Sequence, residues 1–185
     1  MIITLSGSPG SGKSTVAKKL ASRLGYKRYY MGEIWRLKAK EKGLTLAEYQ
    51  KLGEKDNSTD REVDEYMKQL AEKEDNLVIE SRTAFHFLPH SLKIFLDIEE
   101  NEGAKRILKD LKLNPDRNEG RDLKTLKDVL KVNRARRKCD QLRYQKYYQI
   151  DLFNPRNYDL VLDTTNLNPE EELEAVWQFV KSKLG

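Results

Sequence analysis

The sequence has 185 residues, with 35 Lys and Arg against 30 Asp and Glu and a formal net charge of +5. That length supports one hydrophobic core and is too short for two domains of ordinary size, while the modest positive charge suits nucleic acid, a phosphorylated small molecule or simple solubility without choosing among them. The single cysteine, Cys139, excludes an internal disulfide, and we find no secretion signal or membrane-spanning apolar run, so we expect a cytoplasmic protein.

Short apolar runs recur between longer amphipathic stretches, a pattern typical of α/β proteins. The predicted strands are Ile2–Ser6, Tyr29–Met31, Leu77–Glu80, Leu92–Leu96 and Leu160–Leu162. The third and the fifth of these runs are continuously apolar rather than alternating, which predicts that helices cover both of their faces, as in a parallel sheet. We therefore expect a three-layer α/β fold with a parallel sheet of about five strands.

Helix-favouring stretches connect these strands. Val16, Leu20 and Leu24 share one face of a helix that follows the first strand, and Pro169 opens a last helix with an apolar stripe. Between the fourth and fifth strands we expect a helix over Ala104–Leu113 and a long helix from about Leu123 onward.

Two segments differ from simple connections. Residues 33–74 are polar and helix-favouring but are broken near Gly43 and again at Gly53–Ser58, and they are too long for a plain crossover. Residues 114–121 carry a proline, a glycine and two arginines, which is the composition of a mobile flap. The sequence therefore predicts an insertion and a flap around one core domain.

Residues 7–14 match the phosphate-binding pattern GxxxxGK[ST], directly after a predicted strand and directly before a predicted helix. The glycines let successive backbone N–H groups turn inward, where they and the positive end of the helix bind several phosphate charges. We expect Lys13 to contact the β- and γ-phosphates of ATP and the Ser14 hydroxyl to ligate Mg²⁺, while Thr15 lies one place too late for the metal. The residues predicted to bind ATP are Gly7, Ser8, Pro9, Gly10, Ser11, Gly12, Lys13, Ser14 and Thr15.

This motif occurs in GTPases, ATPase motors and kinases, so other residues must separate these classes. A GTPase is expected to show Asn/Thr-Lys-x-Asp on a late strand, and the late strand here ends in Asp163-Thr164-Thr165-Asn166. Motor and transporter ATPases use further strand-borne motifs, for which this chain has little room. A kinase of a nucleotide or of another metabolite is therefore favoured.

Four separated parts of the chain, in order, resemble the nucleoside monophosphate kinases, and among these the archaeal-type cytidylate kinases, over essentially the whole length. The matching parts are Thr4–Ala17, Met31–Arg36, Val78–Arg82 and the pair Arg143-Tyr144 with Tyr147–Asp151. The resemblance implies a three-layer P-loop kinase fold in one domain, ATP with Mg²⁺ as phosphoryl donor, and a nucleoside monophosphate, first CMP or dCMP, as acceptor. It also implies that residues 33–74 bind the acceptor and that residues 114–121 form a lid.

Joining two polyanions requires cations, because phosphoryl transfer depends on positioning and electrostatic stabilisation. Arg36 and Arg82 are the candidates for gripping the acceptor's α-phosphate, since a guanidinium can hold two phosphate oxygens at once. By the same resemblance, the residues that close over the donor and the transferring group are Arg106, Arg136 and Arg143, with Arg117 or Arg121. For each arginine, a solvated helix face with surface ion pairs is the alternative.

Acidic residues complete the expected site. Glu80 ends the third strand and is expected to hold a water on Mg²⁺, with Asp97 as a rival for that role. Asp60 and Asp64, with Arg61 beside them, are candidates for reading a cytosine edge, and a charged solvent face explains them equally well. No general base is assigned, because a monophosphate oxygen is already an anionic nucleophile.

Other functions stay open. Ser81 stands where the family usually has Gly, so another nucleoside monophosphate is an alternative acceptor. A small metabolite such as shikimate would need less base-reading machinery than residues 33–74 provide. The run Arg134–Lys138 supports a nucleic-acid-associated NTPase, although lid-helix chemistry and a solvated face explain this run better. We expect a monomer that binds neither membrane nor nucleic acid.

Overall fold

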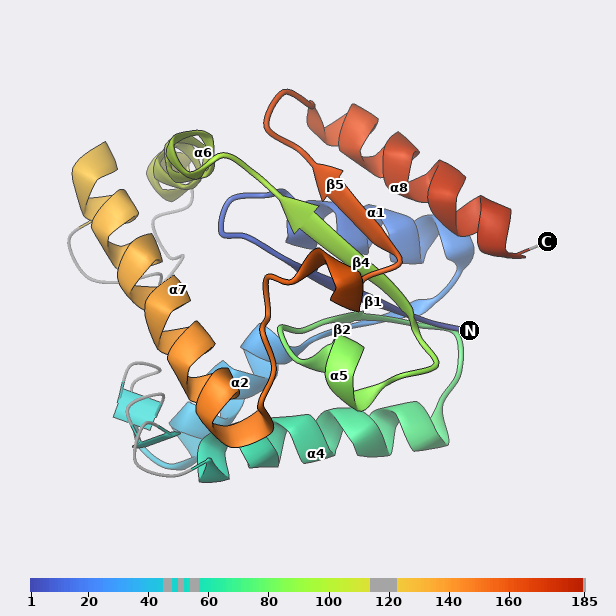
Figure 1. Ribbon diagram of the computed structural model, residues 1–185, viewed down its shortest axis with the longest axis horizontal. Helices are drawn as coiled ribbons and strands as arrows, with labels where there is room; N and C mark the ends of the chain where they lie inside the picture. The colour runs from blue at the N-terminus through green and yellow to red at the C-terminus, as the bar shows by residue number, and fades with distance from the viewer. Residues whose placement is uncertain (45–47, 50–51, 54–56, 114–122, 185) are drawn as a thin grey trace.

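The computed structural model describes residues 1–44, 48–49, 52–53, 57–113 and 123–184 (Figure 1). Strands and helices alternate along the chain, as the sequence predicts. The described elements, in chain order, are β1 (Ile2–Gly7), α1 (Lys13–Leu24), β2 (Lys27–Tyr30), α2 (Met31–Glu41), α4 (Ser58–Lys73), β3 (Leu77–Glu80), α5 (Ala84–Phe87), β4 (Leu92–Asp97), α6 (Glu100–Leu113), α7 (Leu126–Tyr148), the 3₁₀ turn η1 (Pro155–Asn157), β5 (Leu160–Asp163) and α8 (Pro169–Leu184).

The strands form one five-stranded sheet in the order β2-β3-β1-β4-β5, and every pairing is parallel, which confirms the predicted parallel sheet. β1 is central, with Leu5 opposite Glu80 of β3 and Gly7 opposite Leu96 of β4. The carboxyl ends of β3, β1 and β4 therefore meet at one edge of the sheet. In open α/β sheets this edge is the usual place for a ligand.

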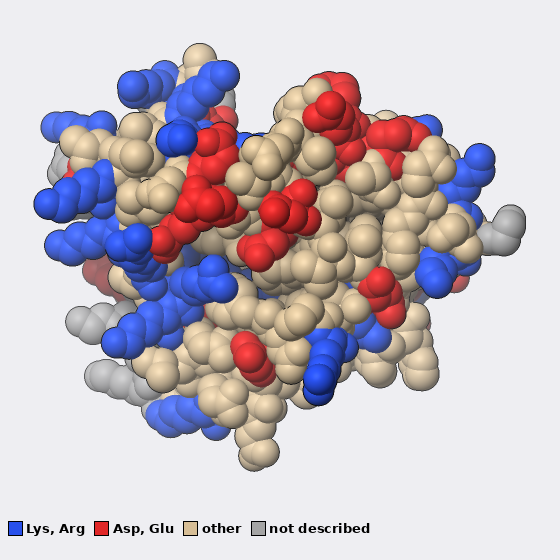
Figure 2. Space-filling model, turned by 45° about the horizontal axis from the view of Figure 1, so that its top comes forward, with Lys and Arg blue, Asp and Glu red and all other residues tan. Residues whose placement is uncertain are grey.

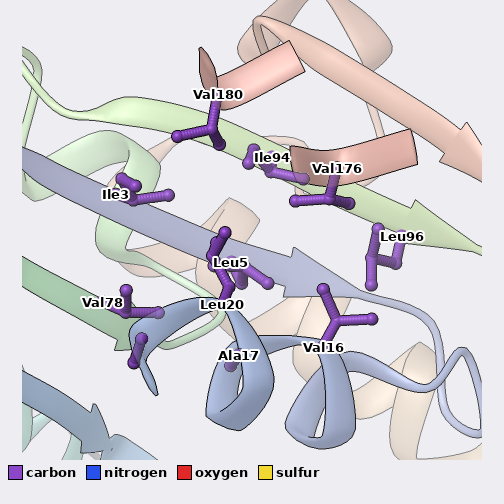
Figure 3. Packing of buried hydrophobic residues seen from close by; sticks show 11 residues of the cluster. Ile3, Leu5, Val16, Ala17, Leu20, Val78, Ile94, Leu96, Val176 and Val180 are labelled. Atoms are coloured by element: carbon purple, nitrogen blue, oxygen red, sulfur yellow. The ribbon is translucent and has the colours of Figure 1, made fainter. Parts of the chain in front are cut away.

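Helices cover both faces of the middle of the sheet. α1 and α8 pack on one face, where Val16 of α1 and Val176 of α8 belong to the same buried cluster as Leu5 and Leu96 (Figure 3). α2, α4 and α5 contribute buried side chains to the opposite face, which includes Ile79 of β3. Burying each such aliphatic side chain contributes about 1.5–3 kcal/mol relative to exposure. This packing fixes the helices against the sheet and thereby fixes the loops at the ends of the strands.

Two sequence predictions about strands need correction. The expected strand Tyr29–Met31 ends one residue early, because Met31 opens α2 and is buried in the core with that helix. The expectation that helices cover both faces of Leu160–Leu162 is wrong. β5 is an edge strand, and Val161 is 43% exposed on the face turned away from α8. A continuous apolar run indicates two-sided burial only for a strand inside a sheet.

α6 and α7 lie together at one end of the molecule, on the left of Figure 1. Both predicted helices are present, but α6 begins earlier than predicted and α7 begins later, at a capping box in which Thr125 and Asp128 satisfy each other's backbone N–H groups. Tyr144, near the end of α7, packs with Phe85 and Leu152, so α7 reaches from α6 to the α5 side of the sheet. In the described part of the chain, no helix is long and apolar enough to cross a membrane.

Candidate active site

The loop between β1 and α1 depends on glycine. Gly10 and Gly12 have φ angles of +85° and +77°, which L side chains rarely adopt. A Cβ on Gly10 would overlap the backbone of Gly103 in α6, and a Cβ on Gly12 would overlap the carboxylate of Glu172 in α8. Gly12 is the N-cap of α1, so the N–H groups that this helix leaves without intrahelical partners lie at the loop. The loop is therefore built to bind an anion.

This loop forms one wall of a cleft at the carboxyl edge of the sheet. The predicted site residues that line the cleft are Gly7, Pro9, Gly10, Lys13, Ser14, Asp64, Glu80, Arg82 and Arg136. They come from the loop and α1, from α4, from the end of β3 and from α7. Figure 2 shows Lys and Arg gathered along the left side of the molecule, the side on which α6 and α7 lie in Figure 1, beside a band of Asp and Glu. The cleft thus joins segments that are far apart in the sequence.

Glu80 and Asp97 end the two strands that flank β1. The Glu80 side chain has no solvent exposure, its Oε1 accepts a hydrogen bond from Arg28 Nε at 2.5 Å, and its Oε2 has no hydrogen-bond partner among the described residues. Asp97 accepts a hydrogen bond of 2.6 Å from the Ser8 hydroxyl, which ties the loop to β4. A buried carboxylate oxygen without a partner is costly unless a ligand satisfies it. Glu80 therefore fits the role of holding a metal-bound water better than Asp97.

Two arginines and two aspartates of alternating charge form a chain of ion pairs that begins at the cleft and runs into the interior beside α7. Arg82 Nε lies 2.8 Å from Asp140 Oδ2, and the other oxygen of Asp140 lies 3.1 Å from Arg143 Nη2. Arg143 Nε in turn lies 2.9 Å from Asp60 Oδ2. Asp60, Asp140 and Arg143 are buried, and Asp140 lines the cleft together with the partly exposed Arg82. Arg143 fixes the Asp140 carboxylate through one oxygen, and the other oxygen of Asp140 holds the Arg82 guanidinium in place.

Asp64 of α4 is a buried acid at the cleft. Its side chain is 6% exposed and accepts hydrogen bonds from the Thr83 hydroxyl at 2.6 Å and the Tyr148 hydroxyl at 2.7 Å. Burial, opposed in part by these two hydrogen bonds, raises the pKa of Asp64 to about 6. Burial therefore makes the charged form of this carboxylate less favourable in the folded protein than in the unfolded chain.

The raised pKa of Asp64 predicts a pH-dependent stability. The native state holds the proton more tightly than the unfolded chain, so the contribution of Asp64 to stability falls as the pH rises from about 4 to about 6 and stays low above that. A pKa difference of about two corresponds to about 3 kcal/mol. We expect Asp64→Asn to become more stable relative to the wild-type chain by about this amount between pH 4 and pH 7, measured by urea unfolding. An unchanged stability difference at the two pH values would contradict the raised pKa.

Arg36 and Arg106 do not line the cleft as the described residues define it. Arg36 donates to the carbonyl of Gly32 at 3.0 Å, and its guanidinium lies 5.7 Å from the centre of the Tyr30 ring, beside the cleft. Arg106 pairs with the buried Glu172 at 2.6 Å, and its Nη2 donates to three carbonyl oxygens in the loop after β5 at 2.8–3.4 Å. Arg106 therefore joins α6 to α8 and its preceding loop.

The remaining predicted residues fall into two groups. Those that belong to the loop, the first turn of α1 or the ion-pair chain without lining the cleft are Ser8, Ser11, Gly12, Thr15, Asp60 and Arg143. The predicted lid at residues 114–121, with Arg117 and Arg121, lies outside the described residues.

Residues 2–166 match the model of the cytidylate kinase-like family. The chain belongs to this family. Cytidylate kinase from Archaeoglobus fulgidus is 35% identical over 184 residues, which cover 99% of this chain and 96% of the relative. Cytidylate kinase from Pyrococcus furiosus is 37% identical over 185 residues, which cover 100% of this chain and 88% of the relative. The resemblance of the sequence to archaeal-type cytidylate kinases is thereby confirmed.

Solved structures share the fold of this cytidylate kinase-like chain. An uncharacterised protein from Eubacterium ventriosum has a TM-score of 0.72 at 19% identity and covers 98% of this chain and 99% of its own. Shikimate kinase from Bacteroides thetaiotaomicron has a TM-score of 0.62 at 16% identity, with 98% of both chains covered. These likenesses concern the fold alone, and they confirm the predicted three-layer P-loop kinase architecture.

Several side chains that line the cleft of this cytidylate kinase-like chain were not predicted. They include Thr83, Asp140, Phe153 and Tyr158, while Arg137 was named only as part of the run Arg134–Lys138. Asp140 precedes Arg143 by one helical turn, and this spacing of opposite charges on a predicted helix is the signal that would have found it. Arg137 lies 3.9 Å from the centre of the Phe153 ring, and no sequence pattern links these two residues.

Proposed function

We propose that this chain transfers the γ-phosphate of ATP to CMP, giving CDP, and that dCMP is also an acceptor. One observation carries the proposal: the glycine loop with Lys13 and the fixed guanidinium of Arg82 open onto the same cleft. Two polyanions bound at these places lie side by side, which is the arrangement that phosphoryl transfer needs. Family membership, with relatives named cytidylate kinases over nearly the full chain, selects CMP as the acceptor.

In this mechanism Lys13 and the backbone N–H groups of the loop bind the β- and γ-phosphates of ATP, while Arg82 binds the α-phosphate of CMP. An acceptor oxygen attacks the γ-phosphorus, the bond to the bridging oxygen breaks, and ADP leaves. Because the attacking oxygen is already an anion, no residue has to remove a proton. Arg136, which lines the cleft from α7, stabilises the charge on the transferring group.

The other predicted residues take supporting roles in the proposal. Arg143 acts on Arg82 through Asp140, and Arg106 acts on the donor loop through Glu172, which contacts Gly12. Arg36 supports the acceptor side beside Tyr30. We assign Asp64, which lines the cleft, and Asp60, one helical turn before it, to reading the acceptor's base, and the aromatic rings that line the cleft are available to stack on that base. The aromatic lining residues are Tyr30, Trp35, Phe95, Tyr144, Phe153 and Tyr158.

Mg²⁺ is part of the same proposal, and the residues at the cleft fit it. The Ser14 hydroxyl and the buried Oε2 of Glu80 supply oxygen atoms, which Mg²⁺ prefers, and Oε2 has no other partner within the described residues. Ser14 would contact the metal and Glu80 would accept a hydrogen bond from one of its waters. The metal would neutralise charge on the β- and γ-phosphates.

We further propose one kinase domain in which residues 33–74 form the acceptor-binding insertion. Trp35 of α2 and Val63 of α4 line the cleft, which supports this assignment. The proposed lid at residues 114–121 lies outside the described residues. A donor site and an acceptor site formed by one chain support a monomer, and the composition of the chain supports the cytoplasm.

The test is a product assay with Mg²⁺ and ATP in which CMP, dCMP, UMP, AMP, GMP and shikimate are offered one at a time. We expect CDP and dCDP to form faster than any other product. Faster phosphorylation of UMP or AMP would show that the chain is a nucleoside monophosphate kinase with a different acceptor. Turnover of none of these compounds would contradict the proposal. ATP hydrolysis that RNA stimulates and moderate salt does not suppress would instead favour a nucleic-acid-associated NTPase.

A further inference from the structure

Arg28 of β2 is the counter-ion of Glu80 in the neighbouring strand β3. The two strands pair so that Arg28 lies opposite Val78 and Tyr30 lies opposite Glu80, which lets the Arg28 side chain run along the sheet to the carboxylate. Its Nε donates to Glu80 Oε1 at 2.5 Å, and its Nη2 contacts the same oxygen. Nε and Nη2 of Arg28 thus converge on Oε1, and Oε2 is left without a hydrogen-bond partner in the described part of the chain.

This one-sided contact gives the two oxygens of Glu80 different tasks. The Glu80 carboxylate has no solvent exposure, and the Arg28 guanidinium is the positive charge that pairs with it. Because Oε1 is engaged, Glu80 cannot chelate a cation through both oxygens, and Oε2 stays available to a ligand in the cleft that Glu80 lines. Arg28 also lines a surface groove with Ser14 and Thr15, so its charge lies beside the start of α1.

We propose that Arg28 is a positioning residue of this site, which binds Oε1 of Glu80 and so orients the carboxylate with Oε2 available for a water on the divalent cation that accompanies ATP. The inference rests on the proposed function, where Glu80 has this role. Partners that orient the groups around a metal in this way typically change metal affinity or activity by about tenfold or more when they are removed. Without the two contacts on Oε1, the Glu80 side chain would lose its fixed orientation, and Oε2 would no longer be held at the cleft.

Arg28→Gln tests the proposal, because it keeps a hydrogen-bond donor and removes the charge. We expect Mn²⁺ to bind about tenfold more weakly to the protein loaded with a non-hydrolysable ATP analogue, as measured by electron paramagnetic resonance. Binding of the analogue without metal should be unchanged. With Mg²⁺, ATP and CMP, kcat should fall about tenfold with the KM for CMP unchanged. Lys27→Gln is the matched control: it removes a cation from the same strand, where Lys27 pairs with Glu74 at the surface, and should bind Mn²⁺ as the wild-type chain does.

A double variant separates positioning from a merely structural ion pair. If Arg28 acts through Glu80, Arg28→Gln added to Glu80→Gln has no further effect on Mn²⁺ affinity. This pair leaves no uncompensated buried charge, so it stays informative where Arg28→Gln alone does not fold. Wild-type Mn²⁺ affinity in folded Arg28→Gln, or a further loss in the double variant, would overturn the proposal. The Mn²⁺ measurement needs no acceptor, so failure to phosphorylate CMP would refute the proposed function separately.

Discussion

Lys13→Ala should lower kcat by at least about 10³-fold. The proposed contact of Lys13 with the β- and γ-phosphates stabilises the negative charge of the transition state, and phosphoryl transfer depends almost entirely on such stabilisation and on positioning. Lys13 is half-buried at the first residue of α1 and lines the cleft, so its truncation removes little of the core. We expect an unchanged circular dichroism spectrum and melting temperature. The measurement is kcat at saturating ATP and CMP.

Lys18→Ala is the matched control, since it removes an exposed lysine from the same helix outside the cleft. It should turn over CMP at close to the wild-type rate. Near-normal activity in a correctly folded Lys13→Ala variant would refute the assignment of the glycine loop as the ATP-binding site.

Arg82→Ala should raise the KM for CMP by about 10- to 100-fold and change the KM for ATP much less. Arg82 is the member of the ion-pair chain that both lines the cleft and keeps part of its surface exposed, so it is placed to take a phosphate in its fork. Asp140 keeps its contact with Arg143 in this variant, and the buried part of the chain is therefore preserved. Steady-state kinetics with each substrate varied in turn give the two KM values.

Arg82→Lys separates charge from geometry at this position. Lysine keeps the charge and loses the fork, so we expect it to recover only part of the lost affinity for CMP. Arg156→Ala, which removes an exposed arginine from η1, should leave both KM values unchanged. A rise confined to the KM for ATP would place Arg82 on the donor side and refute its role as an acceptor residue.

The fold was predictable because its signals are local. Apolar runs marked all five strands, and the pattern of residues 7–14 required a strand before it and a helix after it. The exception is Leu160–Leu162, where the sequence does not show that β5 is the edge strand of the sheet in the described part of the chain. Position in a sheet is set by long-range pairing, and the same apolar run serves an inner or an edge strand.

The partners of the candidate site residues were not predictable in the same way. Arg28 and Glu80 are separated by 52 residues, and only the pairing of β2 with β3 brings them together. The partner of Arg106 was not predictable either, because Glu172 lies on α8 and no sequence pattern connects α8 to α6. Residue types and their places at strand ends indicated a phosphate site, but the contacts that orient each side chain depend on the assembled fold.

The ion-pair chain has a consequence for which anions the proposed acceptor side would admit. Asp140 already offsets the positive charge of Arg82, so a phosphate that binds this guanidinium gains less from charge than it would at an unpaired arginine. A nucleotide makes up this difference with contacts of its sugar and base. Free inorganic phosphate has neither, so with Arg82 in the proposed role the Asp140 carboxylate would weaken the competition of inorganic phosphate with the nucleotide.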